Sequence, residues 1–498
     1  MFKSILLIKI IRKYKQGCKL SHMALINKDQ IEKLKSKAND LLNRTIDQHV
    51  TLAVTGLSRS GKTAFITSLV NQLINEGNGP ELSFFNPVHQ GQFIAAKRIS
   101  QKNIHIARFD YDNSMAAFVN QPPSWPEPTN GISELRLAIR YKPTDSLLKY
   151  ATDMATLTLD ITDYPGEWLL DLPMLSQTFE EWSEQTLALL IKSPRLELSE
   201  SFLKKVKEID PFQEADENLL TQLSQEYTQL LHAFRNDLGL SVIQPGRFIL
   251  PGELIGAPIL EFIPFPSFAK IDANDYQNAS DKSFIGMLRA RYVEYKERVV
   301  RKFYQQHFLN FDRQIVLADC LTPLNKGPES FSDLKQAITM ILESYNYGQS
   351  SLFSRLFSPK IDKLLFAATK ADHITQEQHR NLESLLNELI HQSKHPLNYN
   401  AIKMKTLAIA SVRATSAGKS LHQGQQVPVI QGRRSIDDTT ITVFPGSVPE
   451  KLPNKEYWQE NHFNFIAFEP LTSVATHECL PHIRMDQVLQ FLLGDKMK

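Results

Sequence analysis

The sequence contains little cysteine and almost no net charge, and each shortage excludes a class of protein. Its 498 residues include three cysteines, Cys18, Cys320 and Cys479, which are too few for a disulfide framework. This favours a reducing compartment, with the cytoplasm as the default. A formal net charge of +2 produces no overall field that would draw the protein onto nucleic acid, so no nucleic-acid partner is expected.

Long hydrophobic runs are also lacking, even near the N-terminus. There, MFKSILLIKIIRKYKQ mixes Ile and Leu with basic residues and is interrupted by Lys9, which makes it a poor signal peptide and too short to span a bilayer. Two explanations stay open for residues 1–22: translation starts at Met23, or the segment is a weak basic anchor at a membrane surface. Residues 28–46 then carry apolar side chains at steps of three and four, which predicts an amphipathic helix.

What the sequence does contain is a strong nucleotide-binding motif, LAVTGLSRSGKT. It matches G-x-x-x-x-G-K-[ST], in which glycines let backbone N–H groups surround the phosphates. Lys62 would reach the β and γ phosphates, and the Thr63 hydroxyl would hold Mg²⁺. The residues expected to contact the nucleotide here are Gly56, Ser58, Arg59, Ser60, Gly61, Lys62, Thr63 and Ala64. The motif therefore predicts a protein that binds a nucleoside triphosphate.

A second motif, LDITDYPGE, ends a predicted strand with Asp163 and places Gly166 three positions later. This is the D-x-x-G spacing of a switch II segment, in which the Asp reaches Mg²⁺ and the Gly N–H contacts the γ-phosphate. A switch I threonine is expected between the P-loop helix and the second strand. Thr129 and Thr144 both precede predicted strands, and we favour Thr129 as the Mg²⁺ ligand. An ordinary turn threonine is the alternative.

The third motif, FAATKADH, is typical of guanine recognition. Thr369, Lys370 and Asp372 form a T-K-x-D variant of the N-K-x-D motif after a predicted strand. A carboxylate such as that of Asp372 accepts hydrogen bonds from N1–H and N2–H of guanine, whereas adenine presents an acceptor at N1. After the next predicted strand, the backbone N–H groups of Ser411 and Val412 could bind guanine O6, with a plain strand end as the alternative.

Hydrolysis requires a positioned water and positive charge near the transferred phosphate. Glu167 directly follows the switch II glycine, where Ras-like proteins carry a water-positioning Gln, so it is the candidate to orient water or act as a base. Arg59 lies inside the P-loop, at a place similar to the P-loop Arg of guanylate-binding-protein and atlastin GTPases, and is the candidate arginine finger. A solvated loop side chain is the alternative for Arg59. Lys62 and Thr129 complete the set expected to support catalysis.

The predicted elements indicate an α/β fold, a P-loop NTPase domain with a mainly parallel sheet. Strands are expected at 52–55, 135–141, 156–163, 315–318, 363–368 and 406–410, and helices after the P-loop, at 331–345, after 374 and at 485–493. Residues 81–131 are expected to be partly irregular. The pattern changes to helices at 174–191, 202–209, 219–234 and 285–308, with strand-like pieces at 247–250 and 259–263.

These changes of pattern predict six segments. They are 1–46, an N-terminal extension and helix; 47–169, the first part of a G domain; 170–311, a helical insertion domain; 312–419, the second part of the G domain; 420–464, a β-hairpin-like excursion; and 465–498, a C-terminal strand and helix packed on the G domain.

Four blocks, GLSRSGKTAFITSLVNQL, ITDYPGEWLLDLPML, LADCLTPLN and LLFAATKADH, resemble the bacterial YcjX family of P-loop NTPases over nearly the whole chain. The resemblance implies a G domain of the TRAFAC class, GTPase-like, interrupted by a helical insertion and using GTP or ATP. The motif residues that it implies are Gly56 to Thr63, Asp163 to Gly166 and Thr369 to Asp372. It further implies a cytoplasmic protein associated with envelope-stress and phage-shock genes, with peripheral contact at the inner membrane as an option.

The leading hypothesis is a regulatory GTPase of the envelope stress response that takes GTP or GDP and Mg²⁺ and acts on an unidentified protein partner. The helical insertion would change position with the nucleotide, because it begins directly after switch II at Gly166 and Trp168. Two alternatives stay open. One is an ATP- or GTP-using stress NTPase with relaxed base specificity, and the other is a non-hydrolysing scaffold that retains GDP.

Overall fold

A computed structural model describes the chain from residue 48 to 498, apart from residues 58, 76–80, 145–151, 267, 269–270, 346–359, 394–401, 461–462, 472–473 and 476. The helix expected at 28–46, the two explanations for the N-terminal segment and the contact expected of Ser58 all lie outside the described residues. Residues His49–Lys498 form one compact unit. No helix in the described part is long and apolar enough to cross a membrane.

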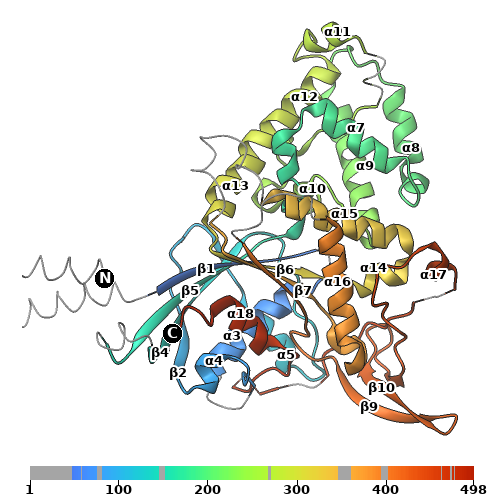
Figure 1. The fold of residues 1–498 in the computed structure, drawn as a ribbon. Coiled ribbons are helices and arrows are strands. Elements are labelled where there is room, and N and C mark those ends of the chain that lie inside the picture. Colours follow the sequence, from blue (N-terminus) through green and yellow to red (C-terminus); the bar gives the residue numbers. More distant parts are fainter. Residues whose placement is uncertain are drawn as a thin grey trace, which may run out of the picture. The chain divides into compact units, whose positions relative to one another are not determined.

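A mainly parallel sheet lies at the centre of this unit (Figure 1). Among the described residues it has eight strands in the order β2-β4-β5-β1-β6-β7-β8, with β3 paired to β4. The strands are β1 (Gln48–Gly56), β2 (Phe93–Ile99), β3 (Ala107–Arg108), β4 (Ser133–Tyr141), β5 (Ala155–Asp163), β6 (Arg313–Ala318), β7 (Lys363–Ala368) and β8 (Lys403–Ala408). β1, β6, β7 and β8 pair in parallel, whereas β4 is antiparallel to both β2 and β5. The expected α/β class is confirmed.

The register of the parallel strands brings their carboxyl ends to one edge of the sheet. Gly56 at the end of β1 is opposite Leu317, and Ala318 at the end of β6 is opposite Ala368. β6 and β7 are buried along their whole length, which is typical of parallel strands covered by helices on both faces. Loops that follow these strands therefore meet at the same edge.

Helices cover both faces of the sheet (Figure 1). α3 (Lys62–Asn75) and α18 (Met485–Leu493) lie on one face, and α15 (Pro328–Ser344) and α16 (His379–Ser393) lie on the other. All four helices are among those that the sequence predicts. The shorter helices around the sheet are α4 (Asn86–His89), α5 (Tyr111–Val119), α14 (Leu321–Lys326) and α17 (Lys455–Glu460). Residues 81–131 are thus more regular than expected, because they contain strand β2 and helix α5.

Residues 170–311, the helical region, carry the expected helices. They are α7 (Phe179–Leu190), α8 (Leu196–Lys207), α9 (Glu217–Asn236), α10 (Gly246–Ile249), α11 (Ala273–Gln277), α12 (Phe284–Glu294), a π-helix η7 (Tyr295–Val300) and α13 (Arg301–Gln306). The expectation of strands at 247–250 and 259–263 is wrong. The first is α10, and the second overlaps the 3₁₀ helix η5 (Pro258–Leu260). Short apolar runs do not distinguish a strand from a buried helical turn, and proline favours the first turn of a helix.

One hydrophobic core runs through the sheet and the helical region. It contains Phe366 on β7 as well as Trp182 on α7 and Tyr292 on α12. The division of the chain at residues 169 and 311 into a G domain and an inserted domain therefore stays a prediction.

A separate three-stranded antiparallel sheet, β9 (Thr415–His422), β10 (Gln425–Arg433) and β11 (Thr440–Val443), forms the expected β excursion but begins before residue 420. The strand expected after residue 465 is wrong: the described residues there form only isolated bridges, at Phe468 and Ile483, before α18. Pro470 and Pro481 stand beside these bridges, and proline has no N–H to continue a ladder.

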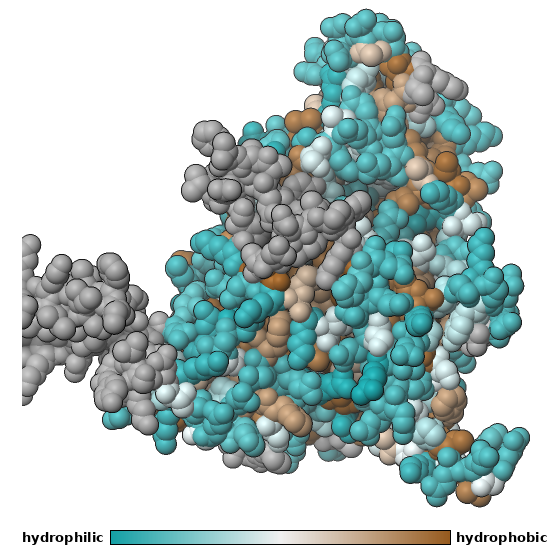
Figure 2. Space-filling model, viewed as in Figure 1, coloured by the Kyte–Doolittle hydropathy of each residue, from teal (hydrophilic) through white to brown (hydrophobic). Residues whose placement is uncertain are grey.

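The surface of the described residues carries hydrophobic side chains mostly as single, separated positions. On the face shown in Figure 2, hydrophilic residues predominate and hydrophobic residues form small groups. The most exposed large hydrophobic residues, Ile104, Ile436 and Ile255, lie in three different loops. Scattered exposure of this kind is ordinary for a folded protein.

Candidate nucleotide-binding site

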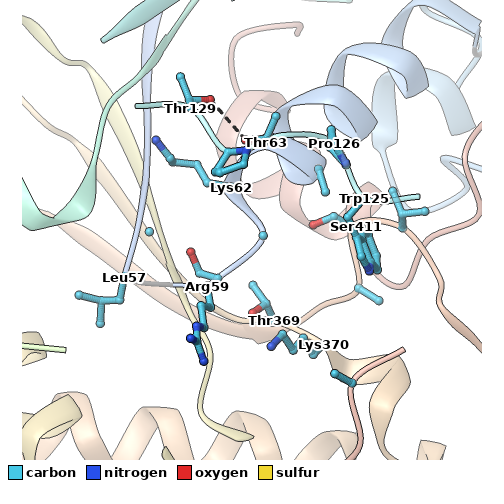
Figure 3. Close-up of a pocket in the computed structure, with 18 of the residues that line it drawn as sticks. Leu57, Arg59, Lys62, Thr63, Trp125, Pro126, Thr129, Thr369, Lys370 and Ser411 are labelled. Carbon is cyan, nitrogen blue, oxygen red and sulfur yellow. Dashed lines mark hydrogen bonds between the residues drawn. The ribbon is translucent and has the colours of Figure 1, made fainter. Parts of the chain in front are cut away.

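A cavity of about 370 Å³ lies at the carboxyl ends of the parallel strands, where ligands of open α/β sheets bind. It brings together motifs that are far apart in the sequence (Figure 3). The predicted residues that line it are Gly56, Arg59, Ser60, Gly61, Lys62, Thr63, Ala64, Thr129, Glu167, Thr369, Lys370, Asp372, Ser411 and Val412. We call the part formed by Gly56, Leu57 and Arg59–Ala64 the P-loop end and the part formed by Thr369–Asp372 the TKAD end.

At the P-loop end, the chain leaves β1 at Gly56 and enters α3 at Lys62. Gly61 has φ 76°, a left-handed conformation that favours glycine, and its carbonyl accepts the hydrogen bond from the Phe65 N–H that starts the helix. The N-terminus of α3 consequently faces the cavity, and the unpaired N–H groups of a helix N-terminus attract anions.

Lys62 and Asp163 form a buried ion pair beside this helix N-terminus. Lys62 Nζ lies 2.5 Å from Asp163 Oδ1, and the Asp163 side chain is 1% exposed. Apart from this ion pair, neither the Nζ atom nor either carboxylate oxygen has a hydrogen-bond partner among the described residues. Buried charged groups with unused hydrogen-bonding capacity are costly unless a ligand completes their partners, so Lys62, which lines the cavity, fits an anionic ligand. Asp163 is not among the described residues that line the cavity.

Two threonine hydroxyls meet nearby. Thr63 Oγ1 lies 3.3 Å from Thr129 Oγ1, the dashed contact in Figure 3. Thr144 is not among the described residues that line the cavity. The structure therefore places the favoured switch I candidate next to the P-loop threonine.

Switch II packs directly on the P-loop. A Cβ atom on Gly166 would lie 2.3 Å from the carbonyl oxygen of Gly56, so any larger residue would force the two loops apart. Gly166 does not itself line the cavity, but Glu167 does. The Glu167 carboxylate is buried and forms an ion pair with Arg235, at 3.2 Å between Arg235 Nη2 and Glu167 Oε1.

Arg235 is a cavity residue that sequence analysis missed. It lies in the last turn of α9, in the helical region. The helical region also contributes Leu250, a second lining residue that the sequence did not predict. Neither belongs to a recognisable motif, and both are more than 60 positions from switch II. Only the tertiary fold brings them to the site.

Arg59 also lines the cavity, but its guanidinium is directed away from Lys62 and Thr63 (Figure 3). It donates a hydrogen bond of 2.9 Å to the carbonyl of Asn236, the last residue of α9. Arg59 has φ 61°, an unusual conformation for a residue other than glycine. Its expected role as an arginine finger stays a prediction, and the structure adds a contact with the helical region.

The residues after Glu167 are fastened to the helical region through a buried carboxylate. Asp171 accepts hydrogen bonds from the Gly246 N–H at 2.8 Å and from the Tyr295 hydroxyl at 2.5 Å. A Cβ atom on Gly246 would lie 2.3 Å from the carbonyl oxygen of Glu167, so α10 approaches switch II as closely as a glycine allows. Burial raises the pKa of Asp171 to about 7, although these hydrogen bonds oppose the rise.

Trp168 provides a second attachment. Its indole N–H donates to the Leu250 carbonyl at 3.1 Å, and the Arg247 guanidinium lies 3.2 Å from the centre of the indole ring. Such a cation–π contact is attractive when it is partly desolvated. Switch II is thus held by α10 and η7 at several points.

At the TKAD end, two loops of the sheet are linked by an ion pair. Lys370, which has φ 62°, places its Nζ atom 2.5 Å from Asp319 Oδ2, just after β6. Burial alone would raise the pKa of Asp319, but the charge and hydrogen bond of Lys370 together lower it. Asp319 therefore stays ionised and fixes the stem of Lys370 along the cavity.

Asp372 lies beside the loop after β8, as the order of the motifs predicts. Its Oδ2 atom accepts a 2.5 Å hydrogen bond from the Ala414 N–H, and its side chain lines the cavity. Ser411 and Val412 line the cavity from the same loop. The hydrogen bond from the Ala414 N–H to one carboxylate oxygen thus fixes the orientation of the Asp372 side chain.

The cavity has further aromatic lining that sequence analysis missed. Trp125 precedes Thr129 and donates from its indole N–H to the Phe468 carbonyl at 2.9 Å. His373 packs with Phe468, and burial lowers the pKa of His373. The sequence does contain one signal for Trp125, the run Trp-Pro-Glu-Pro-Thr. An aromatic residue only four positions before a candidate switch threonine lies close to the nucleotide site along the chain.

The chain is similar to known proteins over nearly its whole length. Residues 50–497 match the family described as YcjX-like family, DUF463. The chain is 47% identical over 468 residues to the Ras-like GTPase YcjX of Escherichia coli K12, covering 94% of this chain and 100% of that protein. It is 43% identical over 484 residues to the Ras-like GTPase YcjX of Shewanella oneidensis MR-1, covering 94% of this chain and 99% of that protein.

Proposed function

This chain belongs to the YcjX-like family, and we propose that it is a GTPase that binds GTP with Mg²⁺ in the cavity at the sheet edge and hydrolyses it to GDP and phosphate. The observation that carries the proposal is the meeting of three distant motifs in one cavity, with Lys62 at one end and Asp372 at the other. The two relatives that bear the name Ras-like GTPase support the same activity.

Guanine selection would depend on Asp372. Its Oδ2 atom is engaged by the Ala414 N–H, which orients the carboxylate as an acceptor toward donors on the base. Guanine offers N1–H and N2–H donors on that edge, whereas adenine would leave the carboxylate facing the N1 lone pair. Lys370 would pack its stem along the base plane, since its ammonium group is held by Asp319.

The P-loop end fits a magnesium triphosphate. The described residues contain no group of three or more His, Cys, Asp or Glu able to hold a metal, so a cation here would take its oxygen ligands from Thr63, Thr129, phosphate and, through water, Asp163. Oxygen ligands of this kind suit Mg²⁺. The ion would neutralise charge on the β- and γ-phosphate oxygens.

Within that arrangement, each protein group has a distinct task. The Lys62 ammonium group, which pairs with Asp163, would also donate hydrogen bonds to the β and γ phosphates. The N–H groups of the loop and of α3 would bind the remaining phosphate oxygens. Glu167 would orient the attacking water, because it directly follows Gly166 and its carboxylate lines the cavity.

We also propose that the helical region changes position with the nucleotide. Support comes from the attachments of switch II to α10 and η7 through Asp171 and Trp168. Any movement of Gly166 toward a γ-phosphate would pull on these contacts. A role in envelope stress, a partner among envelope-stress components and a cytoplasmic or peripheral inner-membrane location stay predictions from the family resemblance.

The test compares GTP and ATP hydrolysis by the purified protein in one assay and identifies any nucleotide that copurifies. Turnover of GTP well above that of ATP is the expected result. Equal, slow turnover of both would favour the NTPase with relaxed base specificity. Retained GDP without turnover would favour the scaffold, and neither binding nor turnover would contradict the proposal.

A further inference from the structure

The C-terminal end of α9 contacts the P-loop end of the cavity twice. Arg235 lies in the last turn of this 20-residue helix and forms the ion pair with Glu167. Asn236 ends the helix, and its carbonyl accepts the hydrogen bond from Arg59. The helical region therefore places two consecutive residues against the loop and the switch that would bind the γ-phosphate.

We propose that Arg235 is the arginine that stabilises the transition state of GTP hydrolysis, so that the helical region supplies an arginine finger from within the same chain. This inference rests on the proposed function. It differs from the expectation for Arg59, and it assigns a catalytic residue to a part of the chain that carries none of the nucleotide-binding motifs.

The position of Arg235 fits this role better than that of Arg59. Arg235 lines the cavity together with Glu167, the water-positioning candidate. The Arg59 guanidinium is instead held by a backbone carbonyl at a helix C-terminus, a favourable place for a cation because of the helix dipole. Arg59 is thereby suited to joining the P-loop to α9, which keeps Arg235 near the site.

The ion pair places the Arg235 guanidinium beside an anionic group in the cavity lining. Arg235 Nη2 lies 3.2 Å from Glu167 Oε1. Both side chains are mostly buried, with 23% of Arg235 and 5% of Glu167 exposed. A γ-phosphate beside Glu167 would present more negative charge to the guanidinium than the carboxylate does, and a planar guanidinium can bind two phosphate oxygens at once.

In the hydrolytic step, water attacks the γ-phosphorus, and the bond to the β–γ bridging oxygen breaks with its electron pair going to GDP. The proton of the attacking water passes to an oxygen of the γ-phosphate, which leaves as dihydrogen phosphate. Negative charge grows on the bridging and γ oxygens during this step. Arg235 would bind these oxygens, while Glu167, released from the ion pair, would accept a hydrogen bond from the attacking water. The two partners of one ion pair would thus take separate roles when GTP binds.

The experiment measures single-turnover GTP hydrolysis, GDP affinity and formation of the GDP–aluminium fluoride complex, which mimics the transferring phosphate. For Arg235→Ala we expect a hydrolysis rate lower by about a hundredfold or more, since cis and trans fingers contribute on the order of 10³ to 10⁵. GDP affinity should change less than about threefold, because a finger acts mainly in the transition state. The aluminium fluoride complex should be lost, and added guanidinium should restore part of the rate.

The matched control is Arg298→Ala on η7 in the same helical region. Arg298 is 73% exposed and pairs with Glu294 one turn away, so hydrolysis, the aluminium fluoride complex and the response to guanidinium should all stay as in the unaltered protein. Arg235→Lys should retain little of the rate, because an ammonium cannot reproduce the fork of donors.

Full hydrolysis and an intact aluminium fluoride complex in Arg235→Ala would overturn the inference while leaving the proposed function in place. Loss of GDP binding together with the rate, without recovery in guanidinium, would also overturn it by showing a structural role. If the unaltered protein hydrolyses no GTP, the proposed function itself fails, which the same assay reveals before any variant is compared.

Discussion

The two ends of the cavity are built in different ways. At the TKAD end, the contacts that fix Lys370 and Asp372 come from Asp319 and Ala414, in loops that directly follow strands of the central sheet. At the P-loop end, Arg59 and Glu167 contact α9 in the helical region. The contacts that orient Lys370 and Asp372 for base recognition therefore come from loops of the sheet, whereas those of Arg59 and Glu167 come from the helical region.

This difference suggests why the helical region follows switch II in the chain. A rigid base site keeps the nucleotide bound, and a switch attached to a separate group of helices can report which nucleotide it is. Substitutions at the TKAD end should change which base is bound. Substitutions at the P-loop end should change the rate of hydrolysis, and substitutions in the contacts between switch II and the helical region should change the stability of the protein. Both kinds should leave the choice of base unaltered.

The largest effect is expected for Lys62→Ala. It removes the charge that would bind the β and γ phosphates and leaves the buried Asp163 carboxylate without its ion-pair partner. We expect GTP affinity to fall by about a thousandfold, which corresponds to roughly 4 kcal/mol, while the remaining binding still favours guanine over adenine. Calorimetry with GTP and ATP measures both. Lys403→Ala, on the exposed part of β8, is the control that should bind GTP normally.

The next effect concerns the attachment of switch II through Asp171. Because its pKa is about 7 in the folded protein against 3.8 as the ordinary value, the folded state binds more protons than the unfolded state between about pH 4 and 7. The free energy of unfolding should therefore fall as pH rises through this window. Asp171→Asn, which cannot ionise, should remove a pH-dependent contribution of roughly 4 kcal/mol, at about 1.4 kcal/mol per pKa unit.

Urea denaturation at pH 5 and pH 8 measures this. Relative to the unaltered protein, Asp171→Asn should be more stable at pH 8 than at pH 5. The neighbouring Tyr295 stays neutral across the window, since burial raises its pKa well above the ordinary value. An identical pH dependence of the two proteins would show that Asp171 is not a buried acid with a raised pKa.

The smallest effect is expected for Arg59→Ala. Loss of the hydrogen bond to Asn236 would loosen α9 at the P-loop, so we expect kcat for GTP to fall about tenfold with a modest change in GTP affinity. The same assay applied to Arg235→Ala provides the comparison. A greater loss from Arg59→Ala than from Arg235→Ala would exchange the roles of the two arginines, and unchanged turnover would remove Arg59 from the mechanism.

The sequence was sufficient to predict the residues of the TKAD end and, at the P-loop end, the strand, the loop and the helix that follows it. Both consist of residues that immediately follow buried apolar strands, and parallel strands deliver their carboxyl ends to one edge. The sequence pattern also predicted strands and helices that the structure contains, namely β1, β4, β5, β6, β7, β8, α3, α15, α16 and α18. Local pattern and chain order were enough there.

The contacts of the helical region could not be predicted in this way. Arg235 reaches the cavity only because the fold brings the last turn of α9 beside Glu167, and its surrounding sequence, LLHAFRNDL, is typical of an ordinary amphipathic helix. The segment at 247–250 looked like a strand because four residues are too few to show a helical period. β2 was missed because only Ala96 of its seven residues is buried, so its sequence lacks a clear alternation.

The central claim is that the cavity recognises guanine through the Asp372 carboxylate. The most direct measurement is the affinity of the unaltered protein and of Asp372→Asn for GTP and for xanthosine triphosphate, with the surface variant Asp281→Asn as the control. The asparagine amide oxygen can still accept from the Ala414 N–H, so the loop should keep its position. We predict that Asp372→Asn binds GTP about 10- to 100-fold more weakly and xanthosine triphosphate more tightly than the unaltered protein. Unchanged affinity for both nucleotides would contradict the account.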